Sequence, residues 1–415
     1  MKKSIGFLML LITMMVLAAC GSSSSGGEKK AGENVTLKYG MWNKDQVPAV
    51  EKIIENFEKE NPTIKVEIEL TPREQYFQKL ETAANGGAMP DVFWMNGPNV
   101  ARFANGKALL PLTDLIEKDK FEMSNYPETL TSLYTINDDI YGVPKDFDTT
   151  GLFYNKKIFD EAGVPYPDET WTWEDLKEAA VKLTNKEKGI HGIAADLKNQ
   201  GSYYDLIWQN GGEIITDNGK STGFAELEAI EALEYWYSFI DEGLSPTYAQ
   251  LTETWSTDMF MSGKLAMTFD GSWRVAVFKD NPDLDVAPLP QGKERAVTIH
   301  GLANVISAKT KNQDAAWKFV QYLGSADAAQ VFAETGTVIP AYNGLQDAWL
   351  EAVPTMNLKA FIDAVEYSRP LPNIEQTSAL WASETNILKR AWSGEISVEK
   401  AAKELAAEAE GILKK

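Results

Sequence analysis

IKVEIELTPREQYFQKLETAANGGAMPDVFWMN, residues 64–96, contains a complete strand–helix–strand unit. Its first seven residues alternate apolar and polar side chains, as in a strand with one buried face. TPRE at 71–74 predicts a helix start, with Thr71 as N-cap, a proline in the first turn and an acid that closes a capping box. The apolar run VFWM at 92–95 predicts a second strand of the fully buried kind.

The residues before this unit extend the same pattern. Residues 35–39 alternate again and predict a strand, and residues 47–61 place apolar side chains at helical spacing. Strand, helix, strand, helix, strand in this order predicts an α/β fold with a parallel sheet and helices on its faces. Ligands bind beyond the carboxyl ends of such strands. Those ends carry Trp42, Trp94 and Asn96.

The remainder of the chain reads as further α/β structure. TWED at 172–175 predicts a second capping box, with Thr172 as the N-cap residue. Helical patterns cover 226–240, 315–323 and 398–413, and residues 260–269 run from a helix end into a strand. A chain of 415 residues is too long for one small core, so two domains are expected.

The N-terminus predicts a secreted, lipid-anchored protein. Residues 1–19 begin with two lysines and continue with an apolar run too short to span a bilayer, which is typical of a signal peptide. Their last three residues form LAAC with Cys20, which resembles a lipobox and implies cleavage before Cys20 and a lipid on its sulfur. Residues 20–33 then form a Gly/Ser-rich flexible tether. A plain signal peptide with an incidental cysteine is the alternative.

The charge and the cysteine content limit the possible partners. The formal net charge is −20, and such a surface repels nucleic acid and anionic lipid headgroups. Cys20 is the one cysteine, so disulfides cannot stabilise the protein. We expect no nucleic-acid partner, contact with the membrane through the lipid anchor alone, and a location on the extracytoplasmic face of the cell membrane.

The sequence lacks the usual catalytic and metal motifs. It has two histidines, His191 and His300, and we find no nucleophile elbow, zinc signature, EF-hand loop or phosphate loop. We therefore expect no catalytic residues, no cofactor and no metal. His300, just before Gly301, is the histidine more suited to touch a ligand. A glycosidase needs only two carboxylates at a suitable separation, so that alternative stays open.

Aromatic residues give the positive signal. Twelve tryptophans is a high count, and a flat indole ring suits the CH-rich face of a sugar while polar groups take its hydroxyls. We expect one set in loops and available to a ligand, and another packed on helices. The first set is Trp42, Trp94, Trp208, Trp255, Trp273 and Trp381; the second is Trp171, Trp173, Trp236, Trp317 and Trp392. Asp146, Asp148 and Asp270 lie near aromatics and suit hydrogen bonding to adjacent hydroxyls.

The motifs together resemble the bacterial extracellular solute-binding proteins of family 1, carbohydrate-uptake lipoproteins similar to maltose-binding protein. The resemblance covers nearly all of residues 34–410. The matching stretches are FExxxPxIxV at 57–66, GxxPDVF at 87–93, LxPL at 109–112, YGVP at 141–144, YNKxxFxxAGVP at 154–165, WxWxDL at 171–176, FxSGKxAM at 260–267, GSW at 271–273 and PLP at 288–290.

This resemblance implies a two-lobed periplasmic-binding-protein-like fold of type II, each lobe a mostly parallel sheet flanked by helices. The ligand cleft and a hinge lie between the lobes. The family implies an N-terminal lobe of residues 34–145 plus 302–340 and a C-terminal lobe of residues 146–301 plus 341–415. The chain would cross between them near 144–150, 300–304 and 337–341.

The resemblance also implies a function. The protein would capture a sugar, an oligosaccharide given the number of aromatics, by hinge closure and deliver it as a monomer to the permease subunits of an ABC importer, with no catalysis. The implied sugar-contacting residues are Trp42, Trp94, Asn96, Asp146, Phe147, Asp148, Tyr204, Trp208, Trp255, Asp270, Trp273, Gly301 and Arg369. Trp273 of the GSW motif is expected to be the main stacking platform.

Three other functions remain open at this point: a glycosidase, a binding protein for a non-sugar ligand, and a sensor. Besides the glycosidase, acids beside aromatics also suit a polyamine. A phosphate ligand would want clustered basic residues, which we do not find. A sensor that presents the bound sugar to a receptor would share the site and differ only in its partner.

Overall fold

The computed structural model describes residues 34–216 and 219–414. The predicted signal peptide, the lipidation site Cys20 and the tether to residue 33 lie outside the described residues.

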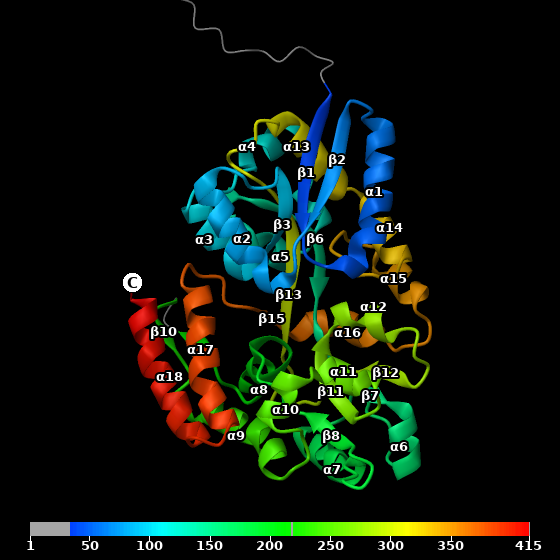
Figure 1. Ribbon diagram of the computed structural model, residues 1–415, viewed down its shortest axis with the longest axis vertical. Helices are drawn as coiled ribbons and strands as arrows, with labels where there is room; N and C mark the ends of the chain where they lie inside the picture. Colours follow the sequence, from blue (N-terminus) through cyan, green and yellow to red (C-terminus); the bar gives the residue numbers. More distant parts are fainter. Residues whose placement is uncertain (1–33, 217–218, 415) are drawn as a thin grey trace, which may run out of the picture. The chain divides into compact units, whose positions relative to one another are not determined.

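Two sheets organise the chain from Val35 onward (Figure 1). The larger sheet has the strand order β14-β6-β13-β3-β1-β2, with β15 paired to β13, and the smaller has the order β12-β7-β11-β8. The larger sheet contains β1 (Val35–Met41), β2 (Ile64–Leu70), β3 (Val92–Asn96), β6 (Gly142–Asp148), β13 (Val297–Ile306), β14 (Ile339–Pro340) and β15 (Ser368–Pro370). The smaller contains β7 (Thr150–Asn155), β8 (His191–Ala194), β11 (Leu265–Gly271) and β12 (Leu284–Ala287). Two short ladders pair β4 (Thr135–Ile136) with β5 (Asp139–Ile140) and β9 (Ile215–Thr216) with β10 (Ser221–Thr222).

The three strands predicted at the N-terminus are confirmed. β1 pairs in parallel with β2 from Val35 opposite Ile64, and in parallel with β3 from Tyr39 opposite Val92. The expectation of mostly parallel sheets is wrong in detail, because both sheets are mixed. β13 runs antiparallel to β3 and β6, and β7 runs antiparallel to β11 and β12. β13 and β7 run opposite to these neighbours, and the direction of a strand within its sheet cannot be predicted from local periodicity.

Helices lie on both faces of the larger sheet (Figure 1). The helices up to residue 261 are α1 (Val47–Glu60), α2 (Arg73–Gly86), α3 (Gly97–Asn105), α4 (Thr113–Asp119), α5 (Glu128–Leu133), α6 (Lys156–Ala162), α7 (Trp173–Leu183), α8 (Tyr204–Gln209), α9 (Leu227–Asp241), α10 (Tyr248–Glu253) and α11 (Ser256–Met261). The later ones are α12 (Val275–Phe278), α13 (Gln313–Leu323), α14 (Ala326–Glu334), α15 (Gln346–Ala352), α16 (Lys359–Asp363), α17 (Thr377–Trp392) and α18 (Val398–Leu413). Every helix predicted from sequence is present.

The two predicted capping boxes have different outcomes. Thr172 caps α7 as expected, because its side chain accepts from the backbone of Asp175 while the Asp175 carboxylate accepts in return. The box at 71–74 is wrong, since α2 starts one residue later with Pro72 in the N-cap position. Thr71 instead accepts a hydrogen bond from Lys79 Nζ at 3.1 Å.

The chain passes between the two sheets in a few places. β6 belongs to the larger sheet and β7, which follows after Thr149, belongs to the smaller. Asp205 of α8 links the two sheets, because its carboxylate accepts from Thr150 Oγ1 of β7 at 3.0 Å and from the backbone of Thr298 in β13. Burial raises the pKa of Asp205 to about 7. One buried carboxyl group on α8 is therefore hydrogen-bonded to a strand of each sheet.

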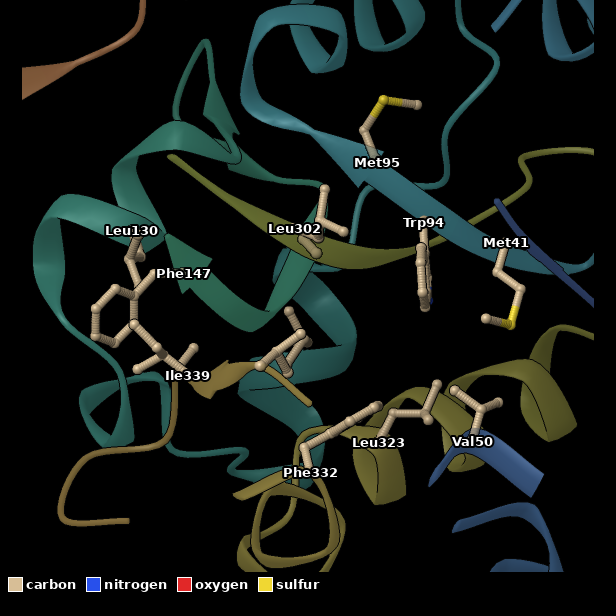
Figure 2. Close-up of a cluster of buried hydrophobic side chains, with 14 of the residues drawn as sticks. Met41, Val50, Trp94, Met95, Leu130, Phe147, Leu302, Leu323, Phe332 and Ile339 are labelled. Atoms are coloured by element: carbon tan, nitrogen blue, oxygen red, sulfur yellow. The ribbon is translucent and has the colours of Figure 1, made fainter. Parts of the chain in front are cut away.

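Large aromatic and sulfur-containing side chains fill the core beside the larger sheet (Figure 2). Trp94 and Met41 are fully buried there, and Phe147 points toward Leu130 and Ile339. A second cluster lies around β7, β11 and helices α7, α8, α9, α17 and α18. Among residues 34–216 and 219–414, no helix combines the length and the apolar content that crossing a bilayer requires.

Candidate functional site

A cleft of about 660 Å³ opens beyond the carboxyl ends of the strands. Its walls come from the loop after β1, the β2–α2 junction, the ends of β3 and β6, and β13, together with the segments around residues 200, 255 and 273. The lining residues are Trp42, Asn43, Lys44, Asp45, Gln46, Leu70, Pro72, Arg73, Asn96, Asp146, Asp148, Gln200, Trp255, Trp273, Arg274, Val277, His300 and Leu302. This is where an α/β sheet is expected to bind a ligand.

Trp42 lies on the cleft wall formed by the larger sheet and is held by other rings. Its ring centre is 5.2 Å from that of Trp94 and 4.8 Å from that of Tyr76, both edge to face. The guanidinium of Arg73 lies 5.2 Å from the Trp42 ring on the cleft side. Such packing fixes the orientation of the indole, so it meets a ligand as a rigid platform.

Trp273 faces the cleft from the segment that follows β11. It is the middle residue of a short 3-10 helix, η5 (Ser272–Arg274), and its ring centre lies 5.5 Å from that of His300. Gly271 makes this position possible, since a Cβ there would come within 1.9 Å of the indole. The GSW motif therefore has a local reason: only glycine leaves room for the ring to fold back over its own backbone.

Asp146 is buried at the base of the cleft and is tightly held. Its carboxylate pairs with the ammonium group of Lys145, and its Oδ1 accepts from the backbone of Leu302 at 2.9 Å. The same ammonium donates to Gln46 Oε1 at 3.0 Å. Lys145 is fully buried, so one hidden cation orients two polar groups of the cleft.

The buried Asp148 and the partly buried His300 form a second pair on neighbouring strands. Asp148 Oδ2 lies 3.6 Å from His300 Nδ1, and Asp148 Oδ1 accepts from Ser272 Oγ at 2.6 Å. Burial, with help from the nearby Asp146 charge, raises the pKa of Asp148 to about 8. Burial also lowers the pKa of His300 to about 4. Both groups are therefore neutral near neutral pH, and the 3.6 Å contact is not an ion pair under those conditions.

The structure brings together six of the thirteen predicted sugar-contacting residues. Trp42, Asn96, Asp146, Asp148, Trp255 and Trp273 all line the cleft. Whether a ligand touches them remains a prediction. They come from segments more than 200 residues apart: the antiparallel pairing of β13 with β3 and β6 brings Asn96 close to Asp146 and Asp148, whereas Trp255 and Trp273 come from segments next to the smaller sheet.

Four of the other seven are buried in the core and do not line the cleft. Trp94 lies on β3 behind Trp42, and Phe147 points to the core side of β6 (Figure 2). Tyr204 and Trp208 lie on α8 rather than in a loop, with their rings edge to face. Trp381, from the aromatic set expected in loops, likewise lies on α17. A strand or a short helix covered on both sides buries all of its large side chains.

Of the remaining three predicted residues, Asp270 and Gly301 lie next to lining residues of the cleft, and Arg369 lies away from it. Asp270 accepts a hydrogen bond from Arg274 Nε at 3.0 Å and so acts behind a lining residue. Gly301 lies between the lining residues His300 and Leu302, but it has no side chain, and a Cβ there would come within 2.3 Å of the Asp146 carbonyl. Arg369 on β15 pairs with Glu213 and Glu294 instead of facing the cleft.

Several lining residues escaped the sequence prediction. The residues 43–46 directly follow Trp42 after β1, so the rule that singled out Trp42 could have found them. Arg274 follows Trp273 in the same way. Arg73 and Gln200 carry no such signal. Gln200 reaches the cleft because Gly201 adopts a left-handed conformation, with φ of 76°, in the turn before α8.

The cleft carries mixed charge. Its cationic residues are Lys44, Arg73 and Arg274, and its acidic residues are Asp45, Asp146 and Asp148. Asp148 is neutral near neutral pH because its pKa is raised to about 8. Within the described residues, no group of three or more histidine, cysteine or carboxylate side chains could hold a metal ion. The site therefore offers aromatic faces and hydrogen-bonding groups.

Comparison with known proteins places the chain in a family. Residues 43–330 match the family of bacterial extracellular solute-binding proteins, and the chain belongs to it. The members of this family are binding proteins, so the chain is a binding protein and not an enzyme.

Relatives and solved structures agree with this placement. A maltooligosaccharide ABC transporter solute-binding lipoprotein of Streptococcus pneumoniae is 29% identical over 368 residues, covering 85% of this chain and 83% of that protein. An ABC substrate-binding protein of Listeria monocytogenes, solved in complex with cycloalternan, is 27% identical with a TM-score of 0.88, covering 92% of this chain and all of that one. The GacH receptor of Streptomyces glaucescens, solved unliganded and with acarbose, is 26% identical with a TM-score of 0.81, covering 92% and 99%. The two-lobed type II fold expected from the motifs is thereby confirmed.

Proposed function

We propose that this protein captures an oligosaccharide in the cleft outside the cell and delivers it to the permease of an ABC importer. One observation carries the proposal: the two indoles of Trp42 and Trp273 and the carboxyl groups of Asp146 and Asp148 line one cleft. Aromatic platforms with a few placed hydrogen-bonding groups are what sugar rings require. The relatives named above, which bind maltooligosaccharides, cycloalternan and acarbose, support the same class of ligand.

Closure of a hinge would enclose the sugar. The proposed lobes are residues 34–145 plus 302–340 and residues 146–301 plus 341–415, so two of their proposed boundaries fall within β6 and β13. Trp42 and Asn96 belong to the first lobe, whereas Trp255 and Trp273 belong to the second. A ligand that touches both sides binds the closed form better, and this difference in affinity shifts the population toward closure.

The polyamine alternative is less suited to this cleft. Lys44, Arg73 and Arg274 line it, and three cationic side chains repel a polycation. The neutral form of Asp148 removes one of the acids that a polyamine would use. A neutral sugar tolerates both features.

Calorimetric titration of the wild-type chain and of Trp42→Ala and Trp273→Ala with maltotriose, maltotetraose, a galactooligosaccharide and spermidine tests the proposal. We expect saturable binding of at least one sugar by the wild type and weaker binding by both variants. Binding of spermidine in place of all the sugars would contradict it.

We further propose that Cys20 carries the lipid that anchors the protein, as a monomer, to the extracytoplasmic face of the membrane. Cys20 ends a signal-like segment, and the Streptococcus pneumoniae relative is a lipoprotein. Two acyl chains give durable anchoring. Cys20→Ser should release the protein from the membrane fraction into the medium, and retention of this variant in the membrane would refute the anchor.

A further inference from the structure

A second cavity of about 260 Å³ adjoins the cleft. Trp255 and Arg274 line both cavities, so the two share a wall. The side pocket continues from there between α10 and the segment after β8, and its other lining residues include Asp196, Lys198, Tyr248 and Thr252. Its volume is several times the roughly 30 Å³ that one water occupies in the liquid. It therefore has room for a sugar ring.

Trp255 is the most informative residue of the shared wall. It stands just before α11 with 57% of its surface exposed, whereas large aromatic side chains elsewhere in the chain are mostly buried. Leaving an indole in water forgoes the free energy of burying an apolar side chain, on the order of 1.5–3 kcal/mol. A ring that borders two cavities can recover this energy by taking a sugar on either side.

The polar lining of the side pocket is already ordered. Asp196 Oδ2 accepts hydrogen bonds from Lys198 Nζ at 2.7 Å and from Ser256 Oγ. The backbone carbonyl of Asp196 accepts from Ser202 and from the buried Trp236. Burial acts to lower the pKa of Lys198, but the charges of Asp196 and Asp270 outweigh it and raise that pKa, which keeps the ammonium group charged. The groups that would meet sugar hydroxyls are thus held in place before any ligand arrives.

This polar network also connects the two cavities. Lys198 Nζ lies 3.9 Å from Asp270 Oδ2, and the same oxygen accepts from Arg274 Nε at 3.0 Å. A cation of the side pocket and a cation of the shared wall are therefore fixed by one buried carboxylate. A ligand that extends from the cleft into the side pocket would meet a continuous line of aromatic and hydrogen-bonding groups.

We propose that the side pocket is an additional subsite, which takes one more ring of the oligosaccharide bound in the cleft. The ring would lie past Trp255, where the indole and Tyr248 offer aromatic faces and Asp196 and Lys198 offer hydrogen-bonding groups. This inference rests on the proposed function. It adds that the protein prefers chains long enough, or branched in the right place, to fill both cavities.

Filling the pocket tests the proposal. Thr252→Trp places a large side chain in the side pocket from an exposed helical position that does not line the cleft. The affinity is measured on the full-length chain in detergent. We expect the affinity for the longest maltooligosaccharide that binds, or for a branched α-1,6 analogue, to fall by about tenfold, equivalent to roughly 1.4 kcal/mol. Affinity for the shortest sugar that binds should change less than about twofold, because that sugar is too short to extend from the cleft into the side pocket.

Thr385→Trp is the matched control. Thr252 and Thr385 are both exposed helical threonines whose hydroxyl donates to the carbonyl four residues earlier, at 2.8 and 3.0 Å. Thr385 lines neither cavity, so its replacement should leave all affinities unchanged. If Thr252→Trp does not fold, Tyr248→Ala removes the pocket's second aromatic without adding volume and should weaken the long sugars selectively.

The outcomes separate this inference from the proposed function. Equal losses for short and long sugars, or no loss for the long ones in folded variants, would overturn the extra subsite while leaving sugar binding intact. A wild type with no preference for longer or branched sugars would overturn it as well. A wild type that binds no saccharide at all would contradict the proposed function, and the subsite with it.

Discussion

The ammonium group of Lys145 lies 4.5 Å from the ring centre of Trp94, in the core directly beneath the cleft. It lies at the same distance from the ring centre of Phe332 and pairs with the carboxylate of Asp146. Buried cations of this kind persist only where rings and an opposite charge compensate for the lost water. The same buried cation therefore contributes to the core beside the larger sheet and fixes the position of Asp146 in the cleft.

Lys145→Met should therefore destabilise the protein strongly. The change leaves Asp146 buried without its partner, which typically costs about 3–5 kcal/mol of unfolding free energy. Urea unfolding followed by fluorescence measures the effect. Lys52→Met, at an exposed pair on α1, is the control and should leave the midpoint unchanged. A Lys145→Met protein as stable as the wild type would show that the pair contributes nothing to the fold.

Gly271→Ala should weaken sugar binding without any change to an aromatic residue. The new Cβ would come within 1.9 Å of the Trp273 indole and must displace it. We expect a loss of roughly 1–3 kcal/mol in binding, about that of Trp273→Ala itself, because both changes remove the same platform. Calorimetric titration measures this loss.

The control for this prediction is another glycine. Gly411 lies in α18, and a Cβ there meets no atom within 4 Å. Gly411→Ala should leave affinity unchanged and slightly favour the helix. Equal affinity of Gly271→Ala and wild type would mean that Trp273 does not contact the sugar.

Trp208 and Trp42 should separate stability from binding. Trp208 is 4% exposed in the second core cluster, so Trp208→Ala should cost about 3–5 kcal/mol of unfolding free energy and leave the affinity of the folded protein unchanged. Trp42→Ala should do the opposite and chiefly reduce affinity, since Trp42 lines the cleft. Loss of sugar affinity in a folded Trp208→Ala protein would mean that Trp208 contacts the sugar, as the sequence suggested.

Stability should depend on the Asp148 carboxyl group as pH changes. Its pKa rises from an ordinary 3.8 to about 8 on folding, so between these values the native state holds a proton that the unfolded state has lost. The stabilisation is complete below pH 3.8 and is lost as pH rises through about 8. His300, with its pKa lowered from 6.5 to about 4, acts in the opposite sense below pH 6.5. Asp205 and Glu384, whose pKa values burial raises to about 7, act in the same sense as Asp148 up to that pH. The window between pH 7 and 8 therefore reports mainly on Asp148.

Asp148→Asn should flatten the fall of the melting temperature in that window. Asn keeps the shape and has no proton to lose, so the difference between wild type and variant should shrink or reverse as pH rises. Asp241→Asn, an exposed change on α9, should leave the wild-type slope unaltered. Identical slopes for wild type and Asp148→Asn would contradict the raised pKa.

Local patterns predicted much of this fold because they report local causes. The alternation in 64–70, the Thr172 capping box and the helical spacing in 47–61 depend only on near neighbours, and all three are confirmed. The antiparallel course of β13 and the mixed sheets depend on pairing between distant segments. No single stretch of sequence carries that information.

The site shows the same division. Trp42 follows a strand whose end faces the cleft, and Trp273 belongs to a motif with a steric reason, so the sequence pointed to both. Trp94 and Trp208 carry the same indole but lie on elements covered from both sides. Residue type predicts the chemistry a side chain can perform, whereas the side it faces depends on the tertiary packing of its element. Arg73 and Gln200 reach the cleft only through that packing.

A thermal-shift screen of the full-length chain in detergent against oligosaccharides, monosaccharides and spermidine, with the bound sugar afterwards recovered and identified by chromatography, tests the central claim most directly. Binding to the native state raises the melting temperature by mass action. We predict a large shift with one class of oligosaccharide and recovery of that sugar uncleaved. A cleaved sugar, or a shift with spermidine and with no sugar, would contradict the account.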